Sequence, residues 1–120
     1  MTMIAAQRWK GSKFTVERLE GEESGTVKFR FVGPFTARDM YSSLSPHTLQ
    51  NIFDASPGND EPRIHHLDLT EVPYMDSMGL GILIRHYVHC QAKGIRLMVT
   101  GAGPRVLSLF QIANVEKLFA

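Results

Sequence analysis

The sequence predicts an α/β domain: a mixed β-sheet that opens with a β-hairpin and has α-helices packed against it. Two segments of alternating apolar residues, 14–19 and 26–32, flank a polar turn, which is typical of a hairpin. The segments that follow complete the order βαβαβα, which indicates βαβ units with parallel strands. The length of 120 residues suits a single domain with one hydrophobic core.

Two short helices are expected after the hairpin. Thr36 and Asp39 resemble a capping box, so a helix is expected to begin near Thr36. Ser45 and Pro46 interrupt it, because proline lacks a backbone N–H and a serine can cap the next helix. That second helix ends in a segment dense in turn formers, 56–62. Its expected apolar stripe consists of Leu49, Ile52 and Phe53.

Two further apolar segments, 64–69 and 95–100, are expected to be strands. One face of the first strand would be buried, and the second is too apolar for an edge strand that faces water. The buried face of the first strand would carry His65, Leu67 and Leu69. Pro104 then begins a last helix, whose expected buried stripe is Val106, Leu107, Phe110 and Ala113.

A longer helix is expected between these strands, with Ser77 at its N-cap and with Lys93 and Gly94 at its C-terminus. Gly79 and Gly81 lie in its first turn, where each costs about 1 kcal/mol relative to alanine. Either close packing against the sheet or close approach of a partner would explain them. The expected apolar stripe is Leu80, Leu83, Ile84, Tyr87 and Val88.

The run DLTEVPYMDSMGLGIL, residues 68–83, resembles the STAS domain family and, within it, the anti-sigma factor antagonists of bacteria. In that family an Asp-Ser pair begins the helix after a central strand, and a Gly-Leu-Gly run follows. The resemblance continues into GAGPRVLSLFQIANVEKLF, residues 101–119, which is similar to the family's Gly-x-x-Pro-x-Val helix. It covers roughly residues 13–119.

The resemblance implies a switchable binding module and not an enzyme. Ser77 matches the serine that a partner kinase phosphorylates. In the dephosphorylated form, the protein would bind an anti-sigma factor with serine kinase activity and release a sigma factor. A phosphatase would be a further partner. The implied partner-binding residues are Asp76, Ser77, Met78, Gly79 and Leu80, with Thr36 in the neighbouring loop 33–36.

One alternative remains open for the role of Ser77, and another for the function of the domain. Without the family, Ser77 would be read as a structural N-cap alone. STAS domains also serve as subunits of lipid-transport assemblies or as scaffold and sensor modules, in which the serine need not be phosphorylated. The family often has an acidic residue in the loop near the phosphorylation site, whereas this chain has GPFT before Asp39.

Three other kinds of site are weakly supported. Asp68 and Asp76 could form a catalytic pair, but no base, nucleophile or metal set accompanies them, and they are expected to accept backbone N–H groups. The turn 101–103 resembles a dinucleotide fingerprint, but Val106 occupies the third glycine position. No cofactor is expected.

Metal binding is also not expected. His86, His89 and Cys90 are close on one helix, but a fourth ligand is missing, and His65 and His66 point to opposite faces of their strand. The helix residues are expected to form a solvated face. Cys90 lies late in the helix, where no helix dipole lowers the pKa of its thiol.

Composition narrows the class of partner and the compartment. The chain has 13 basic and 12 acidic side chains and no long basic run, which argues against nucleic-acid binding. A single cysteine fits a reducing compartment. No apolar run is long enough for a signal peptide or a membrane span, so we expect a cytoplasmic protein without direct membrane insertion.

The expected boundaries are an N-terminal arm at residues 1–12 and a STAS-like domain at residues 13–120. Trp9 would either pack back on the sheet or lie in a flexible arm. The chain stops before the last strand and C-terminal helix that the family normally adds. Apolar residues near residue 120 would then lack partners, which makes a homodimer one alternative. These residues are Val115, Leu118 and Phe119.

Overall fold

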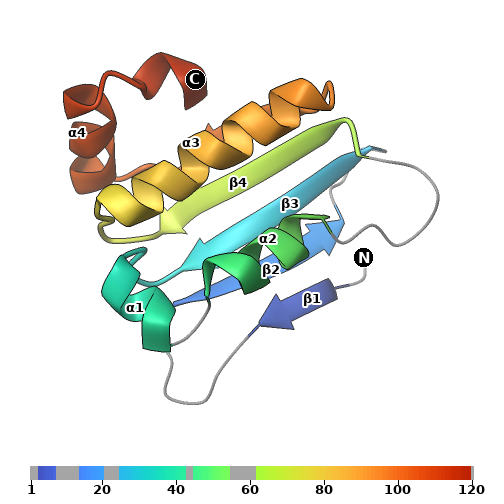
Figure 1. The fold of residues 1–120 in the computed structure, drawn as a ribbon, viewed down its shortest axis with the longest axis horizontal. Helices are drawn as coiled ribbons and strands as arrows, with labels where there is room; N and C mark the ends of the chain where they lie inside the picture. Colours follow the sequence, from blue (N-terminus) through green and yellow to red (C-terminus); the bar gives the residue numbers. More distant parts are fainter. Residues whose placement is uncertain (1–2, 8–13, 21–24, 43–44, 55–61, 120) are drawn as a thin grey trace.

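The computed structural model describes residues 3–7, 14–20, 25–42, 45–54 and 62–119, which form a five-stranded sheet with helices packed on it (Figure 1). The strands are β1 (Met3–Gln7), β2 (Thr15–Glu20), β3 (Thr26–Val32), β4 (Ile64–Glu71) and β5 (Arg96–Thr100). The helices are α1 (Ala37–Ser42), α2 (Pro46–Asp54), α3 (Ser77–Ala92) and α4 (Pro104–Ile112), with a 3-10 helix η1 (Glu116–Phe119).

The sheet is mixed, as predicted, with its strands in the order β1-β2-β3-β4-β5. β1, β2 and β3 pair antiparallel, so the predicted hairpin is confirmed, whereas β3, β4 and β5 pair parallel. α1 and α2 connect β3 to β4, and α3 connects β4 to β5. The connections therefore bring the ends of β3 and β4 side by side, next to the starts of α1 and α3 (Figure 1).

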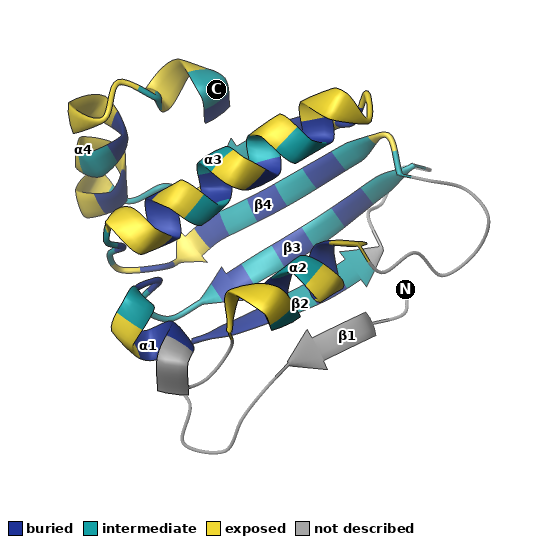
Figure 2. Ribbon diagram, in the orientation of Figure 1, coloured by how far each residue is buried: buried dark blue, intermediate teal, exposed yellow. Residues whose placement is uncertain are grey.

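Alternate residues of the inner strands point toward the helices and form the core (Figure 2). On β4 these are His65, Leu67 and Leu69, as predicted, with exposed fractions of 3% or less. The other sheet face carries polar pairs. Among the described residues, Lys28 forms an ion pair with Asp68 at 3.6 Å, and His66 Nε2 lies 2.7 Å from Thr100 Oγ1.

Both short helices begin as predicted. The Thr36 hydroxyl donates to Asp39 Oδ2 at 2.5 Å, and the Asp39 backbone N–H donates back to Thr36 Oγ1 at 3.2 Å. Ser45 caps α2 by accepting from the Thr48 backbone N–H at 3.2 Å. The predicted stripe of α2 is buried in full: Leu49, Ile52 and Phe53. Of the predicted turn at 56–62, residues 56–61 lie outside the described residues.

A buried arginine of β2 joins this helix to the sheet. Arg18 is 1% exposed, and its Nη1 donates to the carbonyl of Ile52 at 3.1 Å, in the last turn of α2. Its guanidinium lies 5.6 Å from the ring centre of Phe29. Burial lowers the pKa of Arg18 below its ordinary value. The alternation of β2 predicts this inward position, but residue type alone places an arginine at the surface.

Two expectations about the edges of the fold are corrected. Residues 3–7 are not an arm outside the domain, because they pair with β2 as the edge strand β1. Trp9 lies outside the described residues. β5 is an edge strand of the described sheet, although it was expected in the interior. This edge position suits β5 because Leu97 is the only buried residue of the strand and because η1 packs against it.

The C-terminal helix buries less than expected. In α4, Val106 and Phe110 are buried, but Leu107 is 41% exposed, and Ala113 at the C-cap is exposed, so the buried stripe of this helix is narrower than predicted. Phe119 does not lack partners: it is 3% exposed, and its ring centre lies 5.0 Å from that of Phe110. Val115 and Leu118 are partly buried and also pack against the core. None of the three therefore argues for a homodimer, which stays a prediction. No described helix is both long and apolar enough to cross a bilayer.

Candidate partner-binding site at the start of helix α3

Two loops meet at the carboxyl ends of β3 and β4. The backbone N–H of Phe35 donates to the carbonyl of Tyr74 at 3.0 Å, and the N–H of Asp76 donates to the carbonyl of Phe35 at 3.3 Å. Phe35 and Met75 also form an isolated parallel bridge. The loop 33–36 and the segment before Ser77 are therefore held together, and the start of α1 lies beside the start of α3.

Asp76, and not Ser77, caps α3. The Oδ1 atom of Asp76 accepts from the backbone N–H of Gly79 at 3.0 Å, and the Asp76 backbone is extended. Its Oδ2 atom accepts from the backbone N–H of Ala37 at 3.0 Å, at the start of α1. The predicted N-cap is thus one residue too late. Asp76 is the favoured N-cap because its one carboxylate accepts from free N–H groups of two helices.

Ser77 is the first residue of α3 and is exposed to solvent. Met78 beside it is 41% exposed. The free backbone N–H groups and the positive end of the helix dipole lie in this turn, and both favour negative charge. A hydroxyl at this position is accessible to an enzyme, and a phosphate on it would suit the helix electrostatically.

The two glycines of the first turn have different explanations. A Cβ atom on Gly79 would lie 2.3 Å from the carbonyl oxygen of Phe35, so close packing requires this glycine. A Cβ atom on Gly81 would meet nothing within 4 Å, and Gly81 is exposed. Of the two reasons that the sequence leaves open, packing accounts for Gly79. Within the described chain, no packing contact accounts for Gly81.

The other predicted interface residues lie beneath this surface. Leu80 is 7% exposed and packs in the core, and Thr36 is 8% exposed with its hydroxyl bound to Asp39. The residues that share the exposed side with Ser77 lie further along α3. They are not part of the predicted interface, although helical spacing from Ser77 places them on its side of the helix. They are Gly81, Arg85 and Val88, the last 60% exposed.

The buried stripe of α3 differs from the predicted one. It contains Gly79, Leu80, Leu83, His86 and Cys90, with Ile84 and Tyr87 only partly buried. Contact between Gly79 and Phe35 sets the rotation of the helix. Val88 follows Gly79 by about two and a half turns and therefore lies on the opposite side. The predicted solvated face is thus wrong for His86 and Cys90, and it is right only for the side of His89.

The two buried residues meet His65 of β4, and the surroundings shift all three pKa values. Burial, with the charge of Arg18 as the next cause, lowers the pKa of His65 to about 4. Burial and then His65 lower the pKa of His86 to about 3. Burial raises the pKa of the Cys90 thiol to about 11. His89 points elsewhere, with Nε2 3.3 Å from Asp54 Oδ1.

The weaker candidates take structural roles. Asp68 Oδ1 accepts from the Thr70 backbone N–H at 3.0 Å, as predicted, so both aspartates of the supposed pair bind backbone groups. Gly101 has φ +77°, and a Cβ atom on it would lie 2.3 Å from Thr70 Oγ1. The glycine turn thus serves the crossing between the ends of β5 and β4.

Comparisons with known proteins agree with this fold. The family model of the STAS domain matches residues 18–120. An anti-sigma-B factor antagonist of Listeria monocytogenes is 35% identical over 52 residues, which are 43% of this chain and 46% of that protein. The chain thus matches less than half the length of this curated relative.

Solved structures show the same architecture. An anti-sigma factor antagonist from Mycobacterium paratuberculosis aligns with a TM-score of 0.65 at 19% identity, over 87% of this chain and 82% of that one. A sulfate transporter family protein from Wolinella succinogenes aligns with a TM-score of 0.67 at 18% identity, over 84% and 76%. At these identities the likeness concerns the fold alone.

Proposed function

This chain belongs to the STAS domain family, and we propose that it acts as an anti-sigma factor antagonist, a non-enzymatic module that binds an anti-sigma factor with serine kinase activity. The observation that carries the proposal is the exposed Ser77 at the first position of α3. It directly follows the capping residue Asp76, and the next residue, Met78, is also exposed. The named relative from Listeria monocytogenes supports the class of partner. By sequestering that partner in the cytoplasm, the protein would regulate transcription.

Phosphorylation of Ser77 is the proposed switch. A phosphate adds about 1.5 to 2 negative charges at neutral pH. It would stand beside the Asp76 carboxylate and the apolar Met78, so a surface suited to docking would become strongly anionic. The core would be unaffected because Ser77 is exposed. The charge therefore weakens binding without unfolding the domain, and a phosphatase would restore binding by removing it.

The test is capture of partners from the cells that express this protein. Three baits are compared: the unmodified chain, Ser77→Asp as a charge mimic, and Ser108→Ala as a control in an exposed position of α4. Captured proteins are identified by mass spectrometry, and phosphate on the native protein is mapped by peptide. We expect a kinase-type anti-sigma factor with the unmodified and control baits, at least about tenfold depleted with Ser77→Asp, a difference of about 1.4 kcal/mol.

The alternative is a STAS subunit or scaffold of a lipid-transport or sensory assembly without phosphorylation. The structural likeness to a sulfate transporter family protein makes it the natural competitor. Native protein without phosphate on Ser77, together with transporter subunits captured equally by all three baits, would contradict the antagonist proposal and support this alternative.

A further inference from the structure

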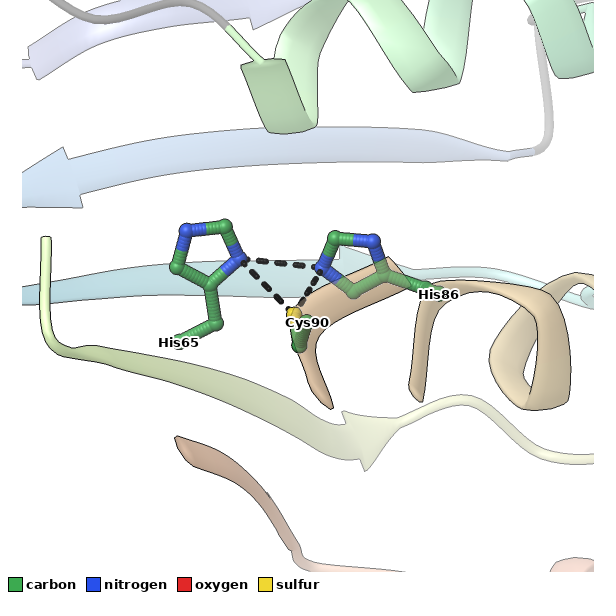
Figure 3. A group of neighbouring side chains, drawn as sticks. All are labelled: His65, His86 and Cys90. Atoms are coloured by element: carbon green, nitrogen blue, oxygen red, sulfur yellow. Dashed lines mark hydrogen bonds between the residues drawn. The ribbon is translucent and has the colours of Figure 1, made fainter. Parts of the chain in front are cut away.

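Three side chains that can bind metals converge inside the core, on the far half of α3 from Ser77. His65 comes from β4, and His86 and Cys90 come from successive turns of α3 (Figure 3). Their exposed fractions are 3%, 1% and 0%. The proposed partner surface does not use them.

The distances between the three ligand atoms fit one metal ion. His65 Nδ1 lies 2.9 Å from His86 Nε2, and Cys90 Sγ lies 3.4 Å from His86 Nε2 and 3.8 Å from His65 Nδ1. The point equidistant from these atoms is about 2 Å from each, close to the usual metal–nitrogen distance of about 2.0 Å and metal–sulfur distance of about 2.3 Å. We propose that His65, His86 and Cys90 bind a thiophilic metal cation of the Cu⁺ or Zn²⁺ class.

Hydrogen bonding alone leaves this cluster incompletely satisfied. The bond between the two imidazoles uses one nitrogen of each ring, and His65 Nε2 and His86 Nδ1 have no hydrogen-bond partner among the described residues. Polar groups buried in this way cost stability. A cation would bind the other nitrogen of each ring and Cys90 Sγ, so it would replace the hydrogen bond between the rings with three coordinate bonds and leave these two nitrogens unpaired. An ordinary core at this place would be apolar.

The surroundings favour the neutral state that a metal needs for the two imidazoles, whereas burial holds the Cys90 thiol in its protonated form. Phe53 stacks on His86 with ring centres 3.8 Å apart, and Phe29 lies 5.0 Å from His65, so the shell is apolar. Burial keeps both imidazoles neutral, which is the form that coordinates metal. The Cys90 thiol would bind as thiolate: its S–H bond breaks, a metal–sulfur bond forms, and the proton leaves to solvent.

The ligand count and charge favour Cu⁺ within this class. Three ligands suit Cu⁺, whereas structural Zn²⁺ sites usually take four, and soft thiolate selects both ions. Cu⁺ with one thiolate gives a neutral centre, which suits an apolar shell near buried Arg18. Bound metal would fasten β4 to α3, the two elements on either side of the Asp76–Ser77 turn.

The experiment starts from the full chain, stripped of metal and refolded under reducing conditions with no metal, with one equivalent of Cu⁺, or with one equivalent of Zn²⁺. Native mass spectrometry then counts bound ions, and thermal melting follows stability. We expect one ion per chain and, at a hundred times the Kd, a rise in Tm of about 10 °C. Alkylation of Cys90 should slow at least tenfold in the metal-loaded protein.

Variants separate this site from other histidines. Cys90→Ser and His86→Gln should lose the bound ion. His66→Gln on the opposite face of β4 and His89→Gln, which replaces a half-buried imidazole beside Asp54, should keep it. No ion on the refolded wild-type chain would overturn the proposal, even if the variants fail to fold. So would an ion that Cys90→Ser retains or that His66→Gln loses. Partner capture through Ser77 is a separate readout, so either proposal can fail alone.

Discussion

The carboxylate of Asp76 joins two helices at one point. One of its oxygens accepts from Gly79 in α3 and the other accepts from Ala37 at the start of α1, each at 3.0 Å. The exposed Ser77 is thus attached to a residue that has no freedom to rearrange without releasing both helix starts. This single side chain holds the candidate site in place.

Replacing Asp76 should therefore destabilise the domain. Asp76→Asn keeps an acceptor for Gly79 but turns an amide toward the Ala37 N–H, and should lower the free energy of unfolding by about 1 kcal/mol. Asp76→Ala removes both caps and should cost about 2 kcal/mol. Urea denaturation measures both variants, with Glu116→Ala at an exposed position of η1 as the control. Equal stability of Asp76→Ala and wild type would refute the double-cap interpretation.

The two first-turn glycines should respond in opposite directions to the same substitution. Gly79→Ala should destabilise the protein by at least about 2 kcal/mol, because the new Cβ would collide with the carbonyl of Phe35. Gly81→Ala should stabilise it by about 1 kcal/mol, because its Cβ meets open space and alanine favours the helix. Thermal melting distinguishes them, and a shift of the same sign for both would contradict the packing described for Gly79.

For individual residues, the sequence predicts that the Asp76–Ser77 pair begins a helix, but not which of the two residues caps it. Asp76 and Ser77 are both good capping residues and are adjacent, so propensity does not choose between them. The choice depends on Ala37, thirty-nine positions away in the sequence, which supplies the second N–H. A different long-range contact, between Gly79 and the carbonyl of Phe35, distinguishes Gly79 from Gly81, and the sequence does not reveal it either.

Helix α3 carries two unrelated faces. Its buried side includes His86 and Cys90, and its exposed side carries Ser77, Gly81, Arg85 and Val88. The apolar pattern correctly predicts that Leu80 and Leu83 are buried but misplaces the rest of the stripe, because histidine counts as polar in such a pattern and valine as buried. The alternation of β4 does place His65 inward, but His86 could be recognised as its neighbour only from the fold.

The buried histidines predict a loss of stability in acid for the metal-free protein. Their folded-state pKa values, about 4 and about 3, lie below the ordinary 6.5, so the unfolded chain takes up protons that the folded chain refuses. The contribution of the two neutral imidazoles to the free energy of unfolding is fully present above pH 6.5. It falls as pH decreases toward 4, by about 1.4 kcal/mol per pH unit for each histidine. Arg18, Asp54, His89 and Lys93 add smaller charge effects.

Urea denaturation with a chelator present, between pH 7 and 5, measures this slope. Most carboxylates titrate below this pH range. His86→Gln should show roughly half of the wild-type slope, whereas His66→Gln should match the wild type. A free energy of unfolding that does not change over this range would mean that the two imidazoles are more accessible to protons than their burial indicates.

For the whole molecule, local signals predict the sheet well except at its edges. The hairpin, the parallel β3-β4-β5 unit and the starts of α1 and α2 follow from alternation, turn residues and capping residues. β1 was missed because five residues, MIAAQ, carry no clear alternation, and its pairing depends on the open edge of β2. β5 looked internal because its sequence is apolar, but its cover comes from η1, a contact that no local pattern contains.

The exposed face of α3 should act as one docking surface. Met78→Glu places a charge beside Ser77 and should weaken partner binding at least tenfold while leaving Tm unchanged, because Met78 is 41% exposed. Ile112→Glu on α4, which is 80% exposed, is the matched control and should bind normally. Titration calorimetry with the captured partner measures both. An equal effect of the two variants would show that surface charge in general, and not this face, controls binding.

The most direct measurement of the proposed switch compares the affinity of two forms of this protein for the captured kinase-type anti-sigma factor: unmodified, and phosphorylated at Ser77 by that kinase. The proposal predicts stoichiometric phosphate on Ser77, absent from Ser77→Ala, and at least a tenfold higher Kd for the phosphorylated form with unchanged Tm. Phosphate on another residue, or equal Kd values for both forms, would contradict it.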